Sequence, residues 1–153
     1  MSKNYPPSNN RPGGYPPPVN EALNKFCSLI QTRRFIDNDI LSLNEDLGRT
    51  LASKREDTIT QINKFYNLVK VAEATDVAQI QVKLHVLKAQ ITYATARETI
   101  SLDFKKFFDV SLEKILKNTN QNERKEWLKD FATFFESVYA YFYFYTKTSR
   151  GGN

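Results

Sequence analysis

Apolar residues recur every three or four positions over most of this chain, a spacing that indicates amphipathic helices rather than strands. The clearest case opens at Thr58-Ile-Thr-Gln61, which fits a reciprocal capping box. The residues that then share one face of the helix are Ile62, Phe65, Tyr66, Val69 and Ala72. We therefore predict a helix that runs from Thr58 to about Ala74 and buries this face, with Phe65 and Tyr66 in the core.

The next helix, predicted from about Val77 to Glu98, has two apolar stripes on nearly opposite sides. The first stripe consists of Ile80, Leu84, Leu87, Ile91 and Ala94. The second consists of Val82, Val86, Ala89, Tyr93 and Ala96. A helix that is apolar on two faces is generally packed on both. We therefore predict that it is the central element of the bundle, with Tyr93 in the core and its hydroxyl bonded to a partner.

The remaining apolar pattern predicts helices before and after this pair. Asn20 is a candidate N-cap for a first helix of about three turns. Short helical pieces are expected around Asp39 to Leu47, with Gly48 as a C-terminal stop. Ser101 is expected to cap a further helix, whose inward side chains are Phe104, Phe107, Phe108, Leu112, Ile115 and Leu116.

The last helix, predicted from about Asn122 to Lys147, is very rich in aromatic residues. Six of the seven residues from Tyr139 to Tyr145 are aromatic, which by itself favours a strand. We assign helix because the three- or four-residue apolar spacing continues through this segment without Gly or Pro. One helix cannot direct all of these rings into its own bundle. We therefore expect Tyr139, Tyr143 and Phe144 to form an exposed protein-contact surface.

Together these patterns predict an all-α protein, a compact bundle of five to six helices that forms one domain over residues 19–147. Residues 1–18 hold all six prolines of the chain and almost no aliphatic side chains, so we expect a disordered Pro-rich tail. Residues 148–153 are expected to form a second, flexible tail.

The chain offers few of the residues that carry catalysis or bind metals. The single histidine, His85, has no neighbouring cysteine or second histidine, which argues against a transition-metal site. No glycine-rich phosphate loop is evident, because the pairs Gly13–Gly14 and Gly151–Gly152 lie in the predicted tails. We expect no metal, no cofactor and no enzymatic activity. A carboxylate dyad stays open as a hydrolytic alternative.

Cys27 is the only cysteine, so no internal disulfide can form, and a reducing, cytoplasmic compartment is expected. We interpret it as a small buried hydrophobe rather than a nucleophile. No apolar run reaches the roughly 20 residues that a membrane span needs. The net charge of +5 and pI of about 9.3 favour anionic partners without identifying them.

Basic residues accompany the two middle helices. The candidates are Lys54, Arg55, Lys64, Lys83, Lys88 and Arg97. For each of them a solvated surface charge is the plain alternative, and Arg97 at a helix end is also favoured by the helix dipole. Phosphate contacts need only a positive group within reach, so these residues could equally hold a nucleic-acid backbone.

Three short blocks carry a resemblance to a known family. They are Gln61-Ile-Asn-Lys-Phe-Tyr-Asn67, Leu87-Lys-Ala-Gln-Ile-Thr-Tyr93-Ala-Thr-Ala-Arg97 and Tyr139-Ala-Tyr141. In their order, spacing and helical context they resemble the small helical subunit of type III-A CRISPR effector complexes, the Csm class. The resemblance covers roughly Lys54 to Tyr141.

The resemblance implies a non-catalytic structural subunit of a ribonucleoprotein that serves antiviral defence. Several copies would pack head to tail along its inner side and face the CRISPR RNA and its target RNA. The partners implied are the phosphate backbones of these RNAs, other subunits of the effector complex and neighbouring copies, with no membrane. Cleavage of the target and nucleotide chemistry would belong to other subunits.

Carried onto this sequence, the basic positions of the family are Lys64, Lys88 and Arg97. Asn63 stands where family members often have arginine, and its amide can still hydrogen-bond a phosphate or a 2′-hydroxyl. The expected RNA-binding set is therefore Lys54, Arg55, Asn63, Lys64, Lys83, Lys88 and Arg97, with the cations aligned outward as one track. The alternative is a helical scaffold or adaptor that binds only proteins, through the aromatic C-terminal helix.

Overall fold

The computed structural model of the protein describes residues 18–150, and every element within this range is helical. In chain order the elements are α1 (Pro18–Leu29), α2 (Asn38–Leu41), α3 (Asn44–Ala52), α4 (Ile59–Glu73), α5 (Val77–Ala96), α6 (Leu102–Lys117), α7 (Gln121–Tyr145) and the π-helical turn η1 (Thr146–Arg150). Helix α2 is a single turn of 4 residues. The six longer α-helices of the described residues confirm the predicted all-α bundle of five to six helices. Of the predicted tails 1–18 and 148–153, residues 1–17 and 151–153 lie outside the described residues, whereas Pro18 begins α1 and residues 148–150 belong to η1.

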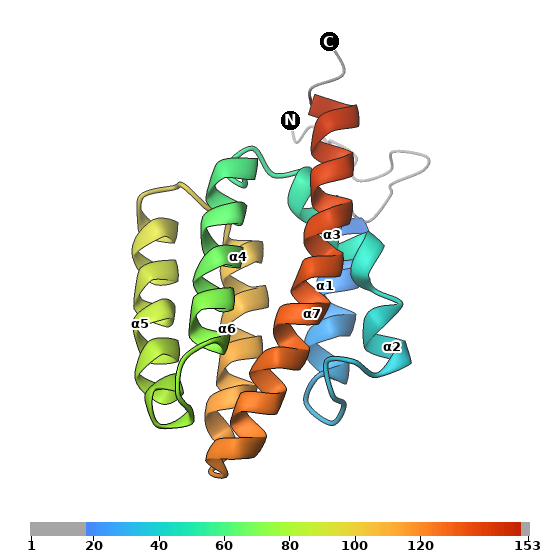
Figure 1. Cartoon of the computed structure of the whole chain (residues 1–153). Helices are drawn as coiled ribbons and strands as arrows, with labels where there is room; N and C mark the ends of the chain where they lie inside the picture. The colour runs from blue at the N-terminus through green and yellow to red at the C-terminus, as the bar shows by residue number, and fades with distance from the viewer. Residues whose placement is uncertain (1–17, 151–153) are drawn as a thin grey trace, which may run out of the picture.

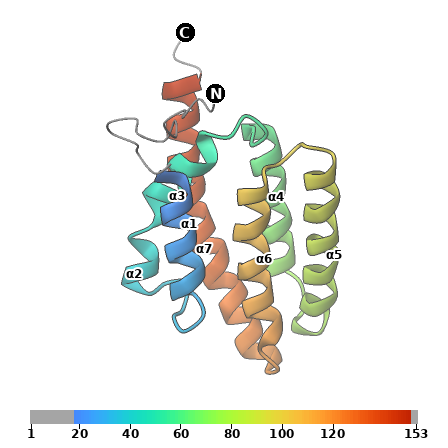
Figure 2. The ribbon, with the colours of Figure 1, turned by 180° about the vertical axis from the view of Figure 1, so that it is seen from behind.

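The long helix α7 runs diagonally through the bundle and separates two groups of helices (Figure 1). On one side lie α4, α5 and α6, and on the other side lie α1, α2 and α3 (Figures 1 and 2). Helix α7 packs against both α3 and α4. It therefore joins the two groups, and α5 is left as the outermost helix.

The helix starts follow the local capping signals of the sequence. The Thr58 hydroxyl accepts a hydrogen bond of 3.2 Å from the backbone amide of Gln61, and the Ser101 hydroxyl accepts one of 3.0 Å from the backbone amide of Phe104. In each case a side-chain oxygen satisfies an amide that has no partner inside the first turn. The predicted starts of α4 and α6 are confirmed.

The core is built mainly from phenylalanine rings of α6 and α7. Phe104, Phe107 and Phe108 of α6 interlock with Phe131, Phe134 and Phe135 of α7, and all six rings are buried. Most of these pairs are tilted or edge-to-face, which suits the charge distribution of aromatic rings. The inward face predicted for the helix after Ser101 is thereby confirmed.

Gly48 does not end a helix as predicted, because it lies inside α3, which continues to Ala52. A Cβ atom on Gly48 would lie 2.6 Å from Cβ of Tyr141 and 2.7 Å from the backbone nitrogen of Phe142. Real Cβ contacts are essentially never that short. The glycine is therefore required by the close approach of α3 to α7.

The prediction that α5 is central was wrong. Only its first stripe is buried, whereas Val82, Val86 and Tyr93 of the second stripe are 57%, 51% and 63% exposed. Helix α5 packs through the buried stripe against α4, α6 and α7, and its other side carries no neighbour among the described residues. Tyr93 is accordingly a surface residue rather than a core residue.

Cys27 on α1 is half-buried and packs against the hydrophobic core. Burial raises the pKa of its thiol, although the nearby Lys106 acts in the opposite direction. A raised pKa leaves less of the nucleophilic thiolate at neutral pH. This environment agrees with the expected role of Cys27 as a small hydrophobe.

Candidate nucleic-acid interface

A groove of about 600 Å³ lies between α4 and α5. These helices are consecutive and antiparallel, so the beginning of α4 lies beside the end of α5 (Figure 1). This arrangement brings Gln61 and Lys64 of α4 opposite Gln90 and Arg97 of α5. The groove is thus lined by two cations and two amide side chains.

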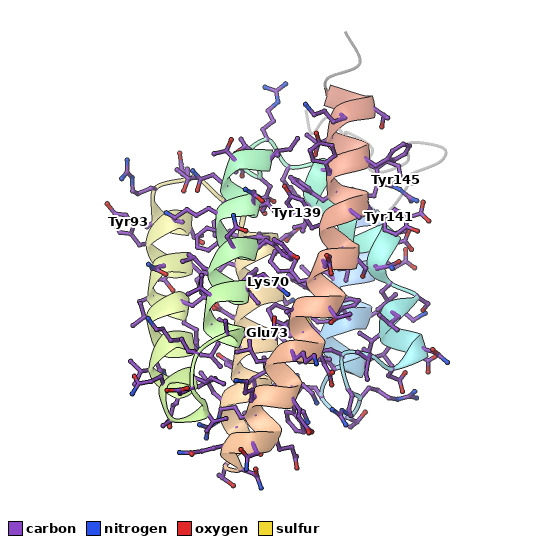
Figure 3. All side chains as sticks on the ribbon, in the orientation of Figure 1. Lys70, Glu73, Tyr93, Tyr139, Tyr141 and Tyr145 are labelled. Carbon is purple, nitrogen blue, oxygen red and sulfur yellow. The ribbon has the colours of Figure 1, made fainter. Side chains whose placement is uncertain are left out.

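The other residues that line this groove are mostly apolar. Val86, Ala89 and Ala94 contribute small side chains, and Tyr93 contributes an aromatic ring. Figure 3 shows Tyr93 at the outer edge of α5, pointing away from the bundle. The surface therefore combines positive charge with accessible apolar area, a combination common at nucleic-acid interfaces.

Arg97 and Tyr93 form a paired unit on the last turn of α5. Nη1 of Arg97 donates a hydrogen bond of 3.2 Å to the Tyr93 hydroxyl, and its guanidinium carbon lies 5.6 Å from the ring centroid. The prediction that the Tyr93 hydroxyl has a partner is therefore confirmed, although the ring itself is exposed. The contact restrains both side chains in one geometry.

Within residues 18–150, neither Lys64 nor Arg97 has a carboxylate in salt-bridge range. Lys64 is exposed, and its ammonium lies 5.6 Å from the centroid of the buried Phe65 ring. Since internal carboxylates do not neutralise these two cations, their charge is available to an external anion.

Lys88 and Lys54 have different surroundings. Lys88 lies on the flank of α5 that faces α6 and forms an ion pair of 3.3 Å with Glu113. Lys54 forms an ion pair of 3.4 Å with Asp103 at the start of α6. The predicted cations therefore do not form one continuous track, because Lys88 is turned away from the groove.

The other three residues of the predicted set are exposed. Arg55 lies on the loop before α4, at the end of the bundle where α5 finishes (Figure 1). Lys83 lies on α5 three residues before Val86, so it continues the groove side of that helix. Asn63 is directed toward α7, where its Oδ1 accepts a hydrogen bond of 3.4 Å from the Tyr139 hydroxyl.

The expected protein-contact surface is only partly exposed. Tyr143 and Phe144 are 44% and 53% exposed near the end of α7, with the ammonium of Lys147 5.6 Å from the Tyr143 ring centroid. Tyr139 instead lies between α4 and α7, half-buried and stacked on Tyr66 (Figure 3). Burial, with Tyr143 and Tyr66 nearby, raises the pKa of the Tyr139 phenol.

Sequence reasoning missed the buried carboxylate of Asp57. It is fully buried and accepts a hydrogen bond of 2.7 Å from the Ser101 amide and another from the Ser101 hydroxyl. These bonds join the loop before α4 to the start of α6, next to the end of the groove. No feature of the sequence distinguishes this carboxylate from the exposed Glu56 beside it.

Gln61 and Gln90 were also not predicted to belong to the binding site, although the sequence contains a signal for Gln90. Lys83, Val86, Gln90, Tyr93 and Arg97 recur at intervals of three and four residues, which places them along one side of a helix. The second apolar stripe therefore belongs to a mixed face that includes charge and amide groups. Such a mixed face is typical of a surface rather than of a core.

The structure offers no sign of a metal centre, because no group of three or more potential ligands occurs within residues 18–150. The same part of the chain contains no helix that is long and apolar enough to cross a membrane.

A family model for Csm2 Type III-A matches residues 37–148, a span that includes both helices of the groove. The chain belongs to the Csm2 Type III-A family. Csm2 proteins are structural, non-catalytic subunits of the type III-A CRISPR complex, and the resemblance found in the three sequence blocks is thereby confirmed. Searches of the curated proteins and of the solved structures found no match.

Proposed function

We propose that this Csm2-family protein binds RNA in the type III-A complex through the groove between α4 and α5, by contacts to the sugar–phosphate backbone of the guide or target. The observation that carries the proposal is the position of Lys64 and Arg97 on the two walls of one groove, without carboxylate partners in the described part of the chain. The subunit has no catalytic role in this proposal.

Two cations on opposite walls suit a polyanionic strand. A phosphate that lies in the groove meets positive charge from both sides, and the arginine can donate two parallel hydrogen bonds to its oxygens. Such contacts hold the backbone and read no sequence, so base pairing with the guide remains the source of specificity. Lys83 and Arg55 extend the positive charge beyond the groove along the same side of α5 and at its end.

Family membership supports the wider assembly that we propose. Several copies pack along the inner side of the ribonucleoprotein, in the cytoplasm, where they contact one another, other subunits and the CRISPR and target RNAs. In this arrangement each copy stiffens the filament and contributes part of a positively charged lining.

We expect the double substitution Lys64→Gln and Arg97→Gln to weaken retention of target RNA by the assembled complex, for all target sequences alike. Each lost phosphate contact should reduce the slope of log affinity against log salt by about 0.7 for a single strand. The measurement is RNA affinity at several salt concentrations for complexes reconstituted with either form of the subunit.

The control for this experiment is Lys88→Gln, which removes one positive charge from the flank of α5 that faces α6. It should leave the salt slope unchanged, because the ammonium of Lys88 is paired with Glu113. An unaltered slope in a correctly assembled double variant would remove Lys64 and Arg97 from the RNA contacts.

The second candidate function, a scaffold that binds only proteins, is favoured by the two exposed rings of Tyr143 and Phe144. The same experiment separates the two functions. A protein-only scaffold would retain target RNA equally well with and without the cations of the groove. It would also co-purify with protein partners after removal of the RNA.

A further inference from the structure

We infer that the groove between α4 and α5 also accepts an unpaired nucleobase, which stacks on the ring of Tyr93. This inference rests on the proposed RNA-binding function and specifies its ligand as unpaired rather than base-paired RNA.

The first support is the state of the Tyr93 side chain. Its ring is 63% exposed, yet its hydroxyl accepts a hydrogen bond of 3.2 Å from Arg97. The ring is therefore held in place while much of its surface remains open to solvent. An aromatic ring that is already restrained loses little conformational entropy when a base stacks on it.

The second support is the shape of the groove beside this ring. Ala89 and Ala94 have the smallest side chains that a helix normally carries, and Val86 adds an apolar wall. The resulting volume of about 600 Å³ lies within the range of small-molecule sites. A flat base has room to enter, and its edge would face the groove walls.

The third support is the polar chemistry around the space. The amides of Gln61 and Gln90 can each donate and accept hydrogen bonds, so they can satisfy the edge of any base. Lys64 and Arg97 supply the positive charge that the attached phosphate requires. The groove thus carries complementary groups for each part of one nucleotide.

A protein helix fits this groove less well than a nucleotide does. An apolar helix that covered Val86 and Tyr93 would also bury Lys64 and Arg97, and uncompensated burial of charge is costly. A perfect RNA duplex fits poorly for another reason, because its bases are stacked inside and cannot reach a side-chain ring. An unpaired nucleotide brings a flat apolar ring and a negative charge together.

The test uses the full chain and a short RNA that carries 2-aminopurine, a fluorescent adenine analogue, either unpaired or in a perfect duplex. We expect the unpaired RNA to bind more tightly and its fluorescence to be quenched by stacking. Tyr93→Ala should weaken binding of the unpaired RNA by about tenfold and abolish the quenching, with no change for the duplex. Tyr93→Phe should retain the quenching, because it keeps the ring, and should weaken binding much less than Tyr93→Ala, because it loses only the hydrogen bond from Arg97.

RNA binding by these variants shows whether only the stacking inference is wrong or the proposed RNA-binding function is wrong as well. If Lys64→Gln with Arg97→Gln weakens binding and Tyr93→Ala does not, the groove binds phosphate only and the stacking inference is overturned. If none of these variants changes binding, the proposed function fails as well. A Tyr93→Ala variant that alters sedimentation but not RNA binding would identify the groove as a protein interface and would also overturn the inference.

Discussion

Replacing Gly48 with alanine is expected to reduce the free energy of unfolding by about 3 kcal/mol. The added methyl group would lie 2.6 Å from Cβ of Tyr141, 2.7 Å from the backbone nitrogen of Phe142 and 2.8 Å from the carbonyl oxygen of Val138. Two of these atoms belong to the backbone of α7, so no change of rotamer can relieve the contact. The helices α3 and α7 would have to move apart.

The direction of the change in unfolding free energy distinguishes a close contact between the helices from an ordinary exposed position in a helix. At a solvent-facing position inside a helix, alanine is more favourable than glycine by about 1 kcal/mol. Urea unfolding followed by circular dichroism would measure the difference between the two proteins. A variant that is more stable than the parent protein would contradict the close contact between α3 and α7.

Replacing Phe135 with alanine is expected to lower the free energy of unfolding by about 3–5 kcal/mol, because it leaves a cavity at the centre of the aromatic core. The Phe135 ring lies 5.2 Å from Phe108, 5.9 Å from Phe107 and 5.8 Å from Phe131, measured between ring centroids. It also meets Tyr66 of α4 at 5.7 Å. The substitution therefore weakens the contacts of α7 with α4 and with α6.

The matched control is Phe144→Ala, which removes the same ring from the same helix at a position that is 53% exposed. This substitution should change the free energy of unfolding by no more than about 0.5 kcal/mol, as most surface substitutions do. Chemical denaturation of both variants gives the comparison. Similar losses at Phe135 and Phe144 would show that the ring of Phe135 does not occupy the core described above.

The boundaries of α4 and α6 could be predicted because their signals are local. A hydroxyl at Thr58 or Ser101 satisfies an amide three residues later, whatever the rest of the chain does. The position of α5 could not be predicted in the same way. Periodicity reveals that a face is apolar, but whether a neighbour covers that face depends on how the other helices pack.

Gly48 illustrates the same limit at a single residue. Glycine near the end of a short apolar pattern favours a helix stop, because it readily adopts left-handed backbone conformations. Here the residue remains helical, and its missing side chain serves a contact with Tyr141 of α7. That contact joins segments far apart along the chain and leaves no trace in the local pattern.

Only part of the candidate site could be predicted from the sequence. Lys64 and Arg97 could be singled out as cations on neighbouring helices, and the antiparallel order of those helices brings them together. The pairing of Lys88 with Glu113 depends on the packing of α5 against α6, which no local pattern encodes. The exposure of Tyr93 likewise follows from the outer position of α5.

The hydrogen bonds between Asp57 and Ser101 have a consequence for local opening of the protein. The amide of an N-cap residue usually exchanges its proton with solvent readily, because no helical carbonyl accepts it. In this protein the Ser101 amide donates to a fully buried carboxylate. Its deuterium exchange therefore requires separation of the loop before α4 from the start of α6, and so reports how often this end of the bundle opens.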